Sequence, residues 1–147
     1  MFDIGRYLGF WYEVARLPNW FEPEGSFSSA EYGLSSDGKI TVKNTSYNPL
    51  WVPFAQQTGV AIPIQSQSFP LKPTLGVSFF PGAWGEYRIE LLFPNYDVAV
   101  VGNSAKSQLW VLSRSRIPRA TLSLIYAQLL NLGYDITRIQ VNPTLVG

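Results

Sequence analysis

The chain has 147 residues, of which 46% are hydrophobic and only 14% are charged, and its formal net charge is +1. This length fits one domain, expected to span residues 1–147. The composition excludes intrinsic disorder, and the small net charge gives no general attraction to nucleic acid. Because the chain has no Cys and no His, Cys nucleophiles, Ser-His-Asp triads and zinc sites with nitrogen or sulfur ligands are excluded, and no cofactor or metal is expected.

The start of the chain shows no targeting segment. Met1 is followed by Phe2-Asp3-Ile4-Gly5-Arg6, which has neither a basic n-region nor an apolar h-region, so no signal peptide is expected. A mature form whose export segment has been removed would begin in the same way. No stretch approaches the ~18 uninterrupted apolar residues of a membrane-spanning helix.

Segments of strand length, rich in Val, Ile, Tyr, Phe and Trp, alternate with Gly and Pro along most of the chain. Short turns such as Ser36-Asp37-Gly38 and Pro94-Asn95 separate them, which favours antiparallel pairing. The fold class predicted is all-β: an eight-stranded up-and-down barrel, a size that can hold one small ligand. The expected strands are Gly9–Leu17, Phe27–Ser35, Lys39–Tyr47, Phe54–Ile64, Thr74–Phe80, Glu86–Phe93, Tyr96–Asn103 and Ser107–Arg114.

One helix is expected after the strands, from Pro118 to Leu132. Leucine and isoleucine recur there at helical spacing, Pro118 suits the first helical position, and Gly133 suits a left-handed C-cap. Its single apolar stripe predicts a helix packed outside the barrel. A last short strand is expected near Arg138–Val141.

Several motifs carry a family resemblance. The first strand opens with Gly9-Phe10-Trp11-Tyr12-Glu13-Val14-Ala15-Arg16, and the last ends with Leu109-Trp110-Val111-Leu112-Ser113-Arg114 before the helix. Together with Tyr47-Asn48-Pro49, Val77-Ser78-Phe79-Phe80 and the turn at Asn95-Tyr96, they resemble the lipocalin family, in particular its bacterial lipocalin and apolipoprotein D branch. The chain departs from the family in two ways. Many lipocalins have a Thr-Asp-Tyr turn where this chain has Asn95-Tyr96, so the Thr and Asp are missing, and the disulfide found in many lipocalins is absent.

The resemblance implies the lipocalin calyx and a small hydrophobic ligand. It also implies that Gly9, Trp11 and Arg114 close the barrel, with the guanidinium stacked on the indole where the last strand meets the first. The bacterial relatives are often anchored by a lipidated Cys, and this chain has no Cys. The expected location is therefore periplasmic or membrane-associated if the protein is bacterial, and otherwise unknown.

Alternation along the strands predicts which side chains face the lumen. Arg88, with Glu86 and Glu90, is expected to face outward. In the first strand Glu13 and Ala15 should share the inward side of Trp11, which makes Glu13 the only charge on the inward list. The cavity is expected to be lined by Ala30, Tyr32, Ile40, Val42, Val77, Phe79, Tyr87, Ile89, Leu91, Val98, Val100, Trp110 and Leu112.

The loops predict a mouth opposite the Trp11 plug. Alternate loops of an up-and-down barrel lie at the same end, so Trp20, Phe21, Trp51 and Trp84, on loops one, three and five, should gather at one rim. Such a rim would guide lipid in or touch a membrane surface, fold down as a lid, or form a homodimer contact.

The function expected is the binding and transport of a fatty acid, lysophospholipid or similar lipid, without catalysis. Because an unpaired carboxylate is costly to bury, the head group of an amphiphile should stay near the mouth. One alternative is an enzyme of the same fold acting on a lipid or isoprenoid, with Glu13 and Tyr32 or Tyr87 as an acid/base pair. Another alternative is an interaction protein with a filled barrel.

Overall fold

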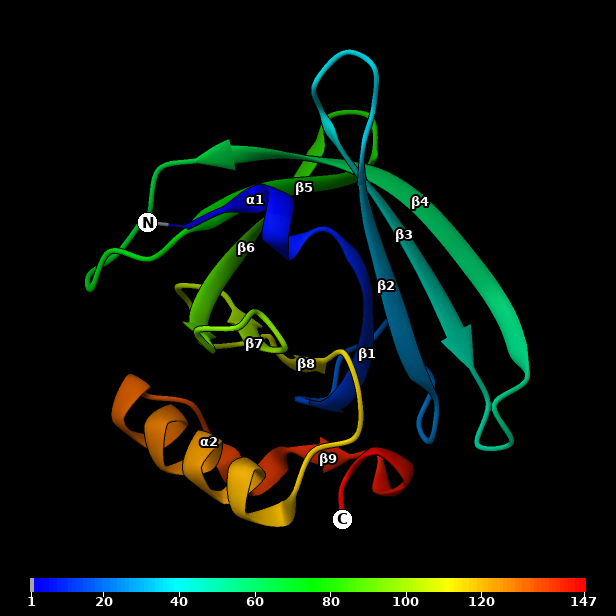
Figure 1. Cartoon of the computed structure of the whole chain (residues 1–147), viewed down its shortest axis with the longest axis vertical. Helices are drawn as coiled ribbons and strands as arrows, with labels where there is room; N and C mark the ends of the chain where they lie inside the picture. Colours follow the sequence, from blue (N-terminus) through cyan, green and yellow to red (C-terminus); the bar gives the residue numbers. More distant parts are fainter. Residues whose placement is uncertain (1) are drawn as a thin grey trace.

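The computed structural model describes residues 2–147 and contains nine strands in one antiparallel sheet (Figure 1). β1 pairs with β2 on one side and with β8 on the other, so eight strands close into a ring, and β9 adds to the end of β1. The predicted up-and-down barrel is confirmed. The strands are β1 (Gly9–Arg16), β2 (Phe27–Leu34), β3 (Ile40–Tyr47), β4 (Pro53–Ile64), β5 (Thr74–Phe80), β6 (Ala83–Leu92), β7 (Val98–Gly102), β8 (Leu109–Ser113) and β9 (Gln140–Val141).

The C-terminal helix α2 (Arg119–Leu132) lies against the outside of the barrel, below β7, β8 and β1 in Figure 1. Pro118 is its N-cap rather than its first helical residue, and Gly133 forms the left-handed C-cap with φ 94°. Leu122, Ile125 and Leu129 are buried against the sheet. Among residues 2–147, none of the helices has the length and apolar character that a membrane-spanning segment requires.

Two apolar layers result, one inside the barrel and one between the barrel and α2. The interior cluster consists of Tyr7, Trp11, Ala30, Tyr32, Ile40, Val42, Ala61, Leu75, Ile89, Ala99, Val101 and Leu112. The helix cluster consists of Val14, Ala15, Leu17, Val98, Val100, Leu109, Val111, Ile117, Leu122, Ile125, Leu129, Tyr134 and Val146. Strands β7 and β8 therefore bury side chains on both faces, because α2 covers their outer side.

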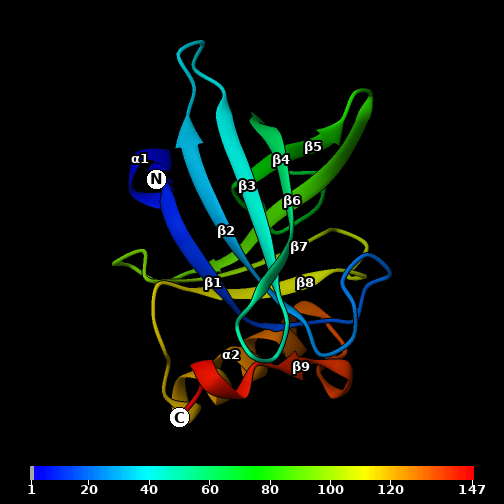
Figure 2. The ribbon, with the colours of Figure 1, turned by 90° about the vertical axis from the view of Figure 1, so that its right-hand side faces the viewer.

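A short helix, α1 (Ile4–Tyr7), closes one end of the barrel, and it was not predicted from the sequence. The Asp3 carboxylate caps it by accepting from the Gly5 amide, and the buried Trp11 indole donates to the Tyr7 carbonyl at 2.9 Å. Figure 2 shows α1 on one side of the barrel and the loop of residues 17–26, called loop 1, on the other. The floor of the barrel is therefore the end at α1, and the mouth is the end at loop 1.

Arg114 ties the last strand to the first behind this floor. Its guanidinium carbon lies 3.7 Å from the centre of the Trp11 ring, and Nη1 donates to the Phe10 carbonyl at 2.9 Å. Further donations reach the carbonyls of Arg6 and Tyr96. A Cβ on Gly9, whose φ is 98°, would lie 3.3 Å from Arg114 Nη1, so the backbone there favours glycine and the approach leaves little room.

Candidate ligand-binding site

The inner face of the barrel changes character from floor to mouth. Around the floor it is apolar and aromatic, with Trp11 and Ile89 almost fully buried. Toward the mouth, strand register places Asn44 and Gln57 on the same face as Ala30, because Ala30 pairs with Asn44 and Asn44 pairs with Gln57. Gln57 is exposed although it shares the inner face, so this part of the lumen is open to water.

Three tyrosine hydroxyls meet in the floor. Tyr87 Oη lies 2.5 Å from Tyr7 Oη and 2.8 Å from Tyr32 Oη, so one hydrogen-bonded chain joins side chains from α1, β2 and β6. Burial raises the pKa of Tyr32 to about 12 and raises the pKa values of Tyr7 and Tyr87 as well. All three phenols therefore stay protonated through the physiological range.

Ten of the thirteen residues predicted to line the cavity belong to the interior cluster or pack against it. Four of them, Val77, Phe79, Tyr87 and Trp110, keep part of their surface exposed. The ten are Ala30, Tyr32, Ile40, Val42, Val77, Phe79, Tyr87, Ile89, Trp110 and Leu112. That they contact a ligand stays a prediction.

The inward orientation predicted for Leu91, Val98 and Val100 is wrong. All three pack in or against the helix cluster, outside the barrel. A β-bulge lies between Ile89, which pairs with Val101, and Leu91, which pairs with Val100, so the alternation of β6 changes face there. In β7 the residues on both faces are apolar, so the sequence shows no alternation that would tell the inner face from the outer one. The inner positions are instead filled by Leu92, Ala99 and Val101.

A second bulge changes the face of β1. It lies between Glu13 and Ala15, and it turns Ala15 into the helix cluster, contrary to the prediction. Glu13 is buried, but its partner is Arg16, whose Nη1 lies 2.9 Å from Glu13 Oε1. No hydrogen bond in the described residues joins Glu13 to Tyr32 or Tyr87, so the acid/base pair considered from the sequence is not assembled.

Arg16 holds loop 1 across the mouth. Its Nη1 lies 2.8 Å from Glu22 Oε2 and also donates to the Ser26 carbonyl, while Nη2 donates to the Pro23 carbonyl at 3.1 Å. Glu22 in turn accepts from Trp110 Nε1 at 3.0 Å, which links the loop to β8. This cluster was not predicted from the sequence, because Arg16 lies at the end of a strand, where exposure is expected, whereas its exposed fraction is only 1%.

Of the residues predicted for the rim, Trp20 and Phe21 lie on loop 1 and Trp51 lies between β3 and β4, and that they line an entrance stays a prediction. Trp20 is 93% exposed on loop 1, and Phe21 packs edge to face on Trp20 and tilted on Trp110. Trp51, with φ 62°, packs against the rings of Tyr47 and Tyr12, and the Tyr12 side chain faces the outside of the barrel. Arg16 therefore fixes the base of loop 1, while Trp20 at its tip stays exposed.

Trp84 does not line the mouth, contrary to the prediction. It lies within β6 rather than in a loop, on the outer face of the sheet. A Cβ on Gly76 would lie 3.4 Å from Trp84 Cε3, so the indole rests over the place where the β5 glycine has no side chain. With Ile62 and Ile64 it borders an outer pocket of about 290 Å³.

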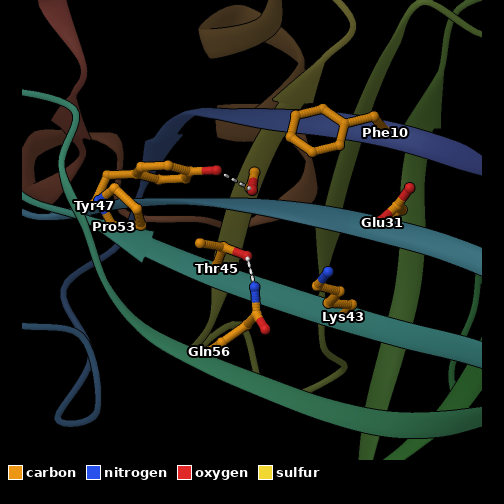
Figure 3. A pocket seen from close by; sticks show the side chains of 8 residues that line it. Phe10, Glu31, Lys43, Thr45, Tyr47, Pro53 and Gln56 are labelled. Atoms are coloured by element: carbon orange, nitrogen blue, oxygen red, sulfur yellow. Dashed lines mark hydrogen bonds between the residues drawn. The ribbon is translucent and has the colours of Figure 1, made fainter.

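A second outer pocket, of about 250 Å³, lies across β1 to β4 (Figure 3). Phe10 and Tyr47 border it with Glu31 and Lys43, which are opposite each other on β2 and β3, and Gln56 donates to Thr45 Oγ1 at its edge. Both pockets are on the outer surface of the sheet, so neither belongs to the lumen.

A closed barrel, plugged at one end and lined with apolar and aromatic side chains, defines a class of small-ligand-binding proteins. A family model described as a lipocalin-like domain matches residues 2–144. This protein belongs to the lipocalin family, whose members generally bind and transport small hydrophobic molecules.

The relatives support the bacterial and apolipoprotein D-like branch. Outer membrane lipoprotein Blc of Escherichia coli is 38% identical over 114 residues, which cover 78% of this chain but only 63% of that protein. Temperature-induced lipocalin-1 of Arabidopsis thaliana is 30% identical over 96% of this chain and 78% of its own length, and apolipoprotein D of Cavia porcellus is 28% identical over 94% and 75%. Among solved structures, lobster apocrustacyanin A1 has the same fold, with a TM-score of 0.69, 16% identity and coverage of 95% and 78%.

Proposed function

We propose that this protein binds and carries a fatty acid, lysophospholipid or similar lipid in the barrel lumen, with residues 1–147 acting as one lipocalin domain. The observation that supports this most is the gradient inside the barrel, from an apolar and aromatic floor to a mouth that carries Asn44 and Gln57 and is open to water. An amphiphile has the same gradient along its length.

The charges around the lumen support one orientation for an anionic lipid. Arg16 is buried at the mouth, but Glu13 and Glu22 already engage its guanidinium. A carboxylate in the floor would therefore be buried without a cation, which is costly. Each CH₂ group of the tail placed in the floor contributes about 0.8 kcal/mol. A fatty acid anion should bind tail first, with its head among the polar groups of the mouth.

Filling the lumen should block binding. Ala30 faces inward beside Trp11, its partner on β1, and the next residue, Glu31, faces outward and is exposed. We expect Ala30→Trp to abolish uptake of a fluorescent fatty acid, and Glu31→Trp to bind like the wild type. Fluorescence titration measures both, and circular dichroism checks that both variants are folded, because the larger side chain also costs stability.

Two results would contradict the proposal. If folded Ala30→Trp binds the fatty acid as the wild type does, the ligand lies elsewhere, and the outer pocket beside Glu31 becomes the place to look. If the wild type takes up no lipid, and mass spectrometry of its organic extract finds none, the filled-barrel alternative is favoured.

We further propose that the mouth touches a membrane surface while lipid enters or leaves. Large apolar side chains project from the loops at that end, with Trp20 93% and Leu50 82% exposed. Loop 1 and residues 48–52 contain no Lys or Arg, and Glu22 and Glu24 lie beside Trp20. Contact should therefore depend on apolar insertion and not on anionic lipid. Relatives named outer membrane lipoproteins support a periplasmic or membrane-associated location in a bacterium.

Leu50→Ser should weaken binding to neutral phosphatidylcholine vesicles, measured by flotation, with little change in stability because the side chain is exposed. Leu34→Ser is the matched control, since Leu34 is 58% exposed at the opposite end of the barrel. Stronger binding of the wild type to anionic vesicles would contradict the apolar mechanism. If Leu50→Ser instead converts a dimer into a monomer, the loop is a contact between two copies.

A further inference from the structure

The three tyrosines in the floor carry one more hydroxyl proton than the hydrogen bonds between them require. Tyr7, Tyr32 and Tyr87 supply three hydroxyl protons, and two hydrogen bonds join their oxygens. No other polar group among residues 2–147 bonds to these hydroxyls. Whichever way the two bonds run, one O–H donor is left without an acceptor, and an unmade hydrogen bond in an apolar site is costly.

Burial indicates which hydroxyl is left over. The Tyr7 side chain is 0% exposed and Tyr32 is 5% exposed, whereas Tyr87 keeps part of its surface open. Tyr87 is also the middle member of the chain, so its oxygen can accept from both neighbours. Its own proton then points away from both, and Val77 and Phe79, which pack against the same cluster, also keep part of their surface exposed.

The surroundings determine which acceptor suits this donor. Arg114 lies behind Trp11, and its donors go to main-chain carbonyls, so it offers nothing to a ligand. The small side chains of Ala61 and Ala99 contribute no polar atoms to the same cluster. Without a cation, an ionised carboxylate is disfavoured, whereas an uncharged carbonyl oxygen needs one donor only.

We propose that Tyr87 donates a hydrogen bond to an uncharged carbonyl oxygen of an apolar ligand, such as a long-chain ketone, aldehyde or ester, that enters the lumen carbonyl first. This inference rests on the proposed function, because it requires that the lumen takes up apolar molecules. It means that the floor would favour ligands with an uncharged carbonyl at the leading end, whereas a fatty acid anion would place only its tail there.

The test compares two ligands of one shape: a long-chain methyl ketone labelled with carbon-13 at the carbonyl, and the alkene with C=CH₂ in place of C=O. Each displaces N-phenylnaphthylamine from the wild type, from Tyr87→Phe, and from Tyr12→Phe, in which the hydroxyl removed lies on the outer face. Tyr87→Phe should weaken ketone binding relative to alkene binding about three- to tenfold, the usual worth of a neutral hydrogen bond, and this ratio removes any general effect of the partner that Tyr7 and Tyr32 lose. Tyr12→Phe should change neither.

Infrared spectra of the bound ketone give a reading that does not depend on affinity. The carbonyl stretch should lie at lower wavenumber in the wild type than in dry hexane, and should return toward the hexane value in Tyr87→Phe. If the ketone and alkene bind the wild type equally and the stretch equals that in hexane, this inference is wrong while the proposed function stands. If neither ligand binds the wild type, this inference is overturned, and the titration with the fluorescent fatty acid decides whether the proposed function stands.

Discussion

Replacing Arg88 by Met should lower the free energy of unfolding by about 3–5 kcal/mol, although the side chain points away from the lumen. Arg88 is 0% exposed and lies under the segment of residues 65–73. Its Nε lies 2.9 Å from Glu90 Oε1, Nη1 donates to Ser66 Oγ at 2.8 Å, and Nη2 donates to the Pro70 carbonyl. The variant leaves the Glu90 carboxylate buried with one cation fewer and frees the segment above it.

The matched control is Lys106→Met, which removes the other cation of Glu90. Lys106 Nζ lies 2.8 Å from Glu90 Oε2, but its side chain is 26% exposed, so water screens the interaction and a loss of about 1 kcal/mol or less is expected. Urea denaturation measures both variants. Equal and small losses in both would show that the segment of residues 65–73 does not depend on Arg88.

Arg88 also shows what strand alternation can predict: the direction of a side chain, but not its exposure. The alternation of β6 correctly gives an outward direction for Arg88, because Tyr87 and Ile89 belong to or pack against the interior cluster. Outward is not the same as exposed, however, and a long loop after β4 folds over this part of the sheet. Nothing local in the sequence states where a loop rich in Ser and Pro will lie. A substitution at Arg88 is therefore no neutral control for the lumen, and Glu31 serves better.

The strands were predictable because each fits a half-buried pleated surface. Thr74–Phe80 is reproduced without change, and the boundaries of the others shift by at most a few residues. The faces were predictable only while the alternation ran unbroken. One bulge in β1 and one in β6 each change the face of the residues that follow, and neither contains a glycine or proline that would signal it.

The floor was predictable in part. Trp11 and Arg114 could be placed together from the first and last strands, whereas Tyr7 could not be placed at all. Its helix has four residues, too few to show a helical period, and the only local signal is Asp3 at the N-cap. The tyrosine chain therefore needed the structure, although Tyr32 and Tyr87 were both expected to face inward.

The cluster at the mouth should make stability depend on pH in an unusual direction. Burial, and next the negative charge of Glu22, raise the pKa of Glu13 well above its ordinary value. Between that ordinary value and the raised one, the folded protein holds a proton that the unfolded chain has lost. The free energy of unfolding should therefore fall as pH rises through this interval. In Glu13→Gln this fall should be absent, because the amide still accepts from Arg16 and has no proton to lose.

Arg16→Met should have the larger effect at neutral pH, a loss of about 3–5 kcal/mol, because Glu13 and Glu22 would stay buried without their guanidinium and the carbonyls of loop 1 would lose their donor. The loss should shrink at acid pH, below the raised pKa of Glu13, because a protonated carboxyl needs no cation. Loop 1 should also become sensitive to proteolysis after Phe21, since Arg16 no longer holds its base. Urea denaturation at both pH values, together with limited chymotrypsin digestion, measures these effects. A loss that is the same at both pH values would show that Arg16 acts here through its packing on Phe27 and not through its charge.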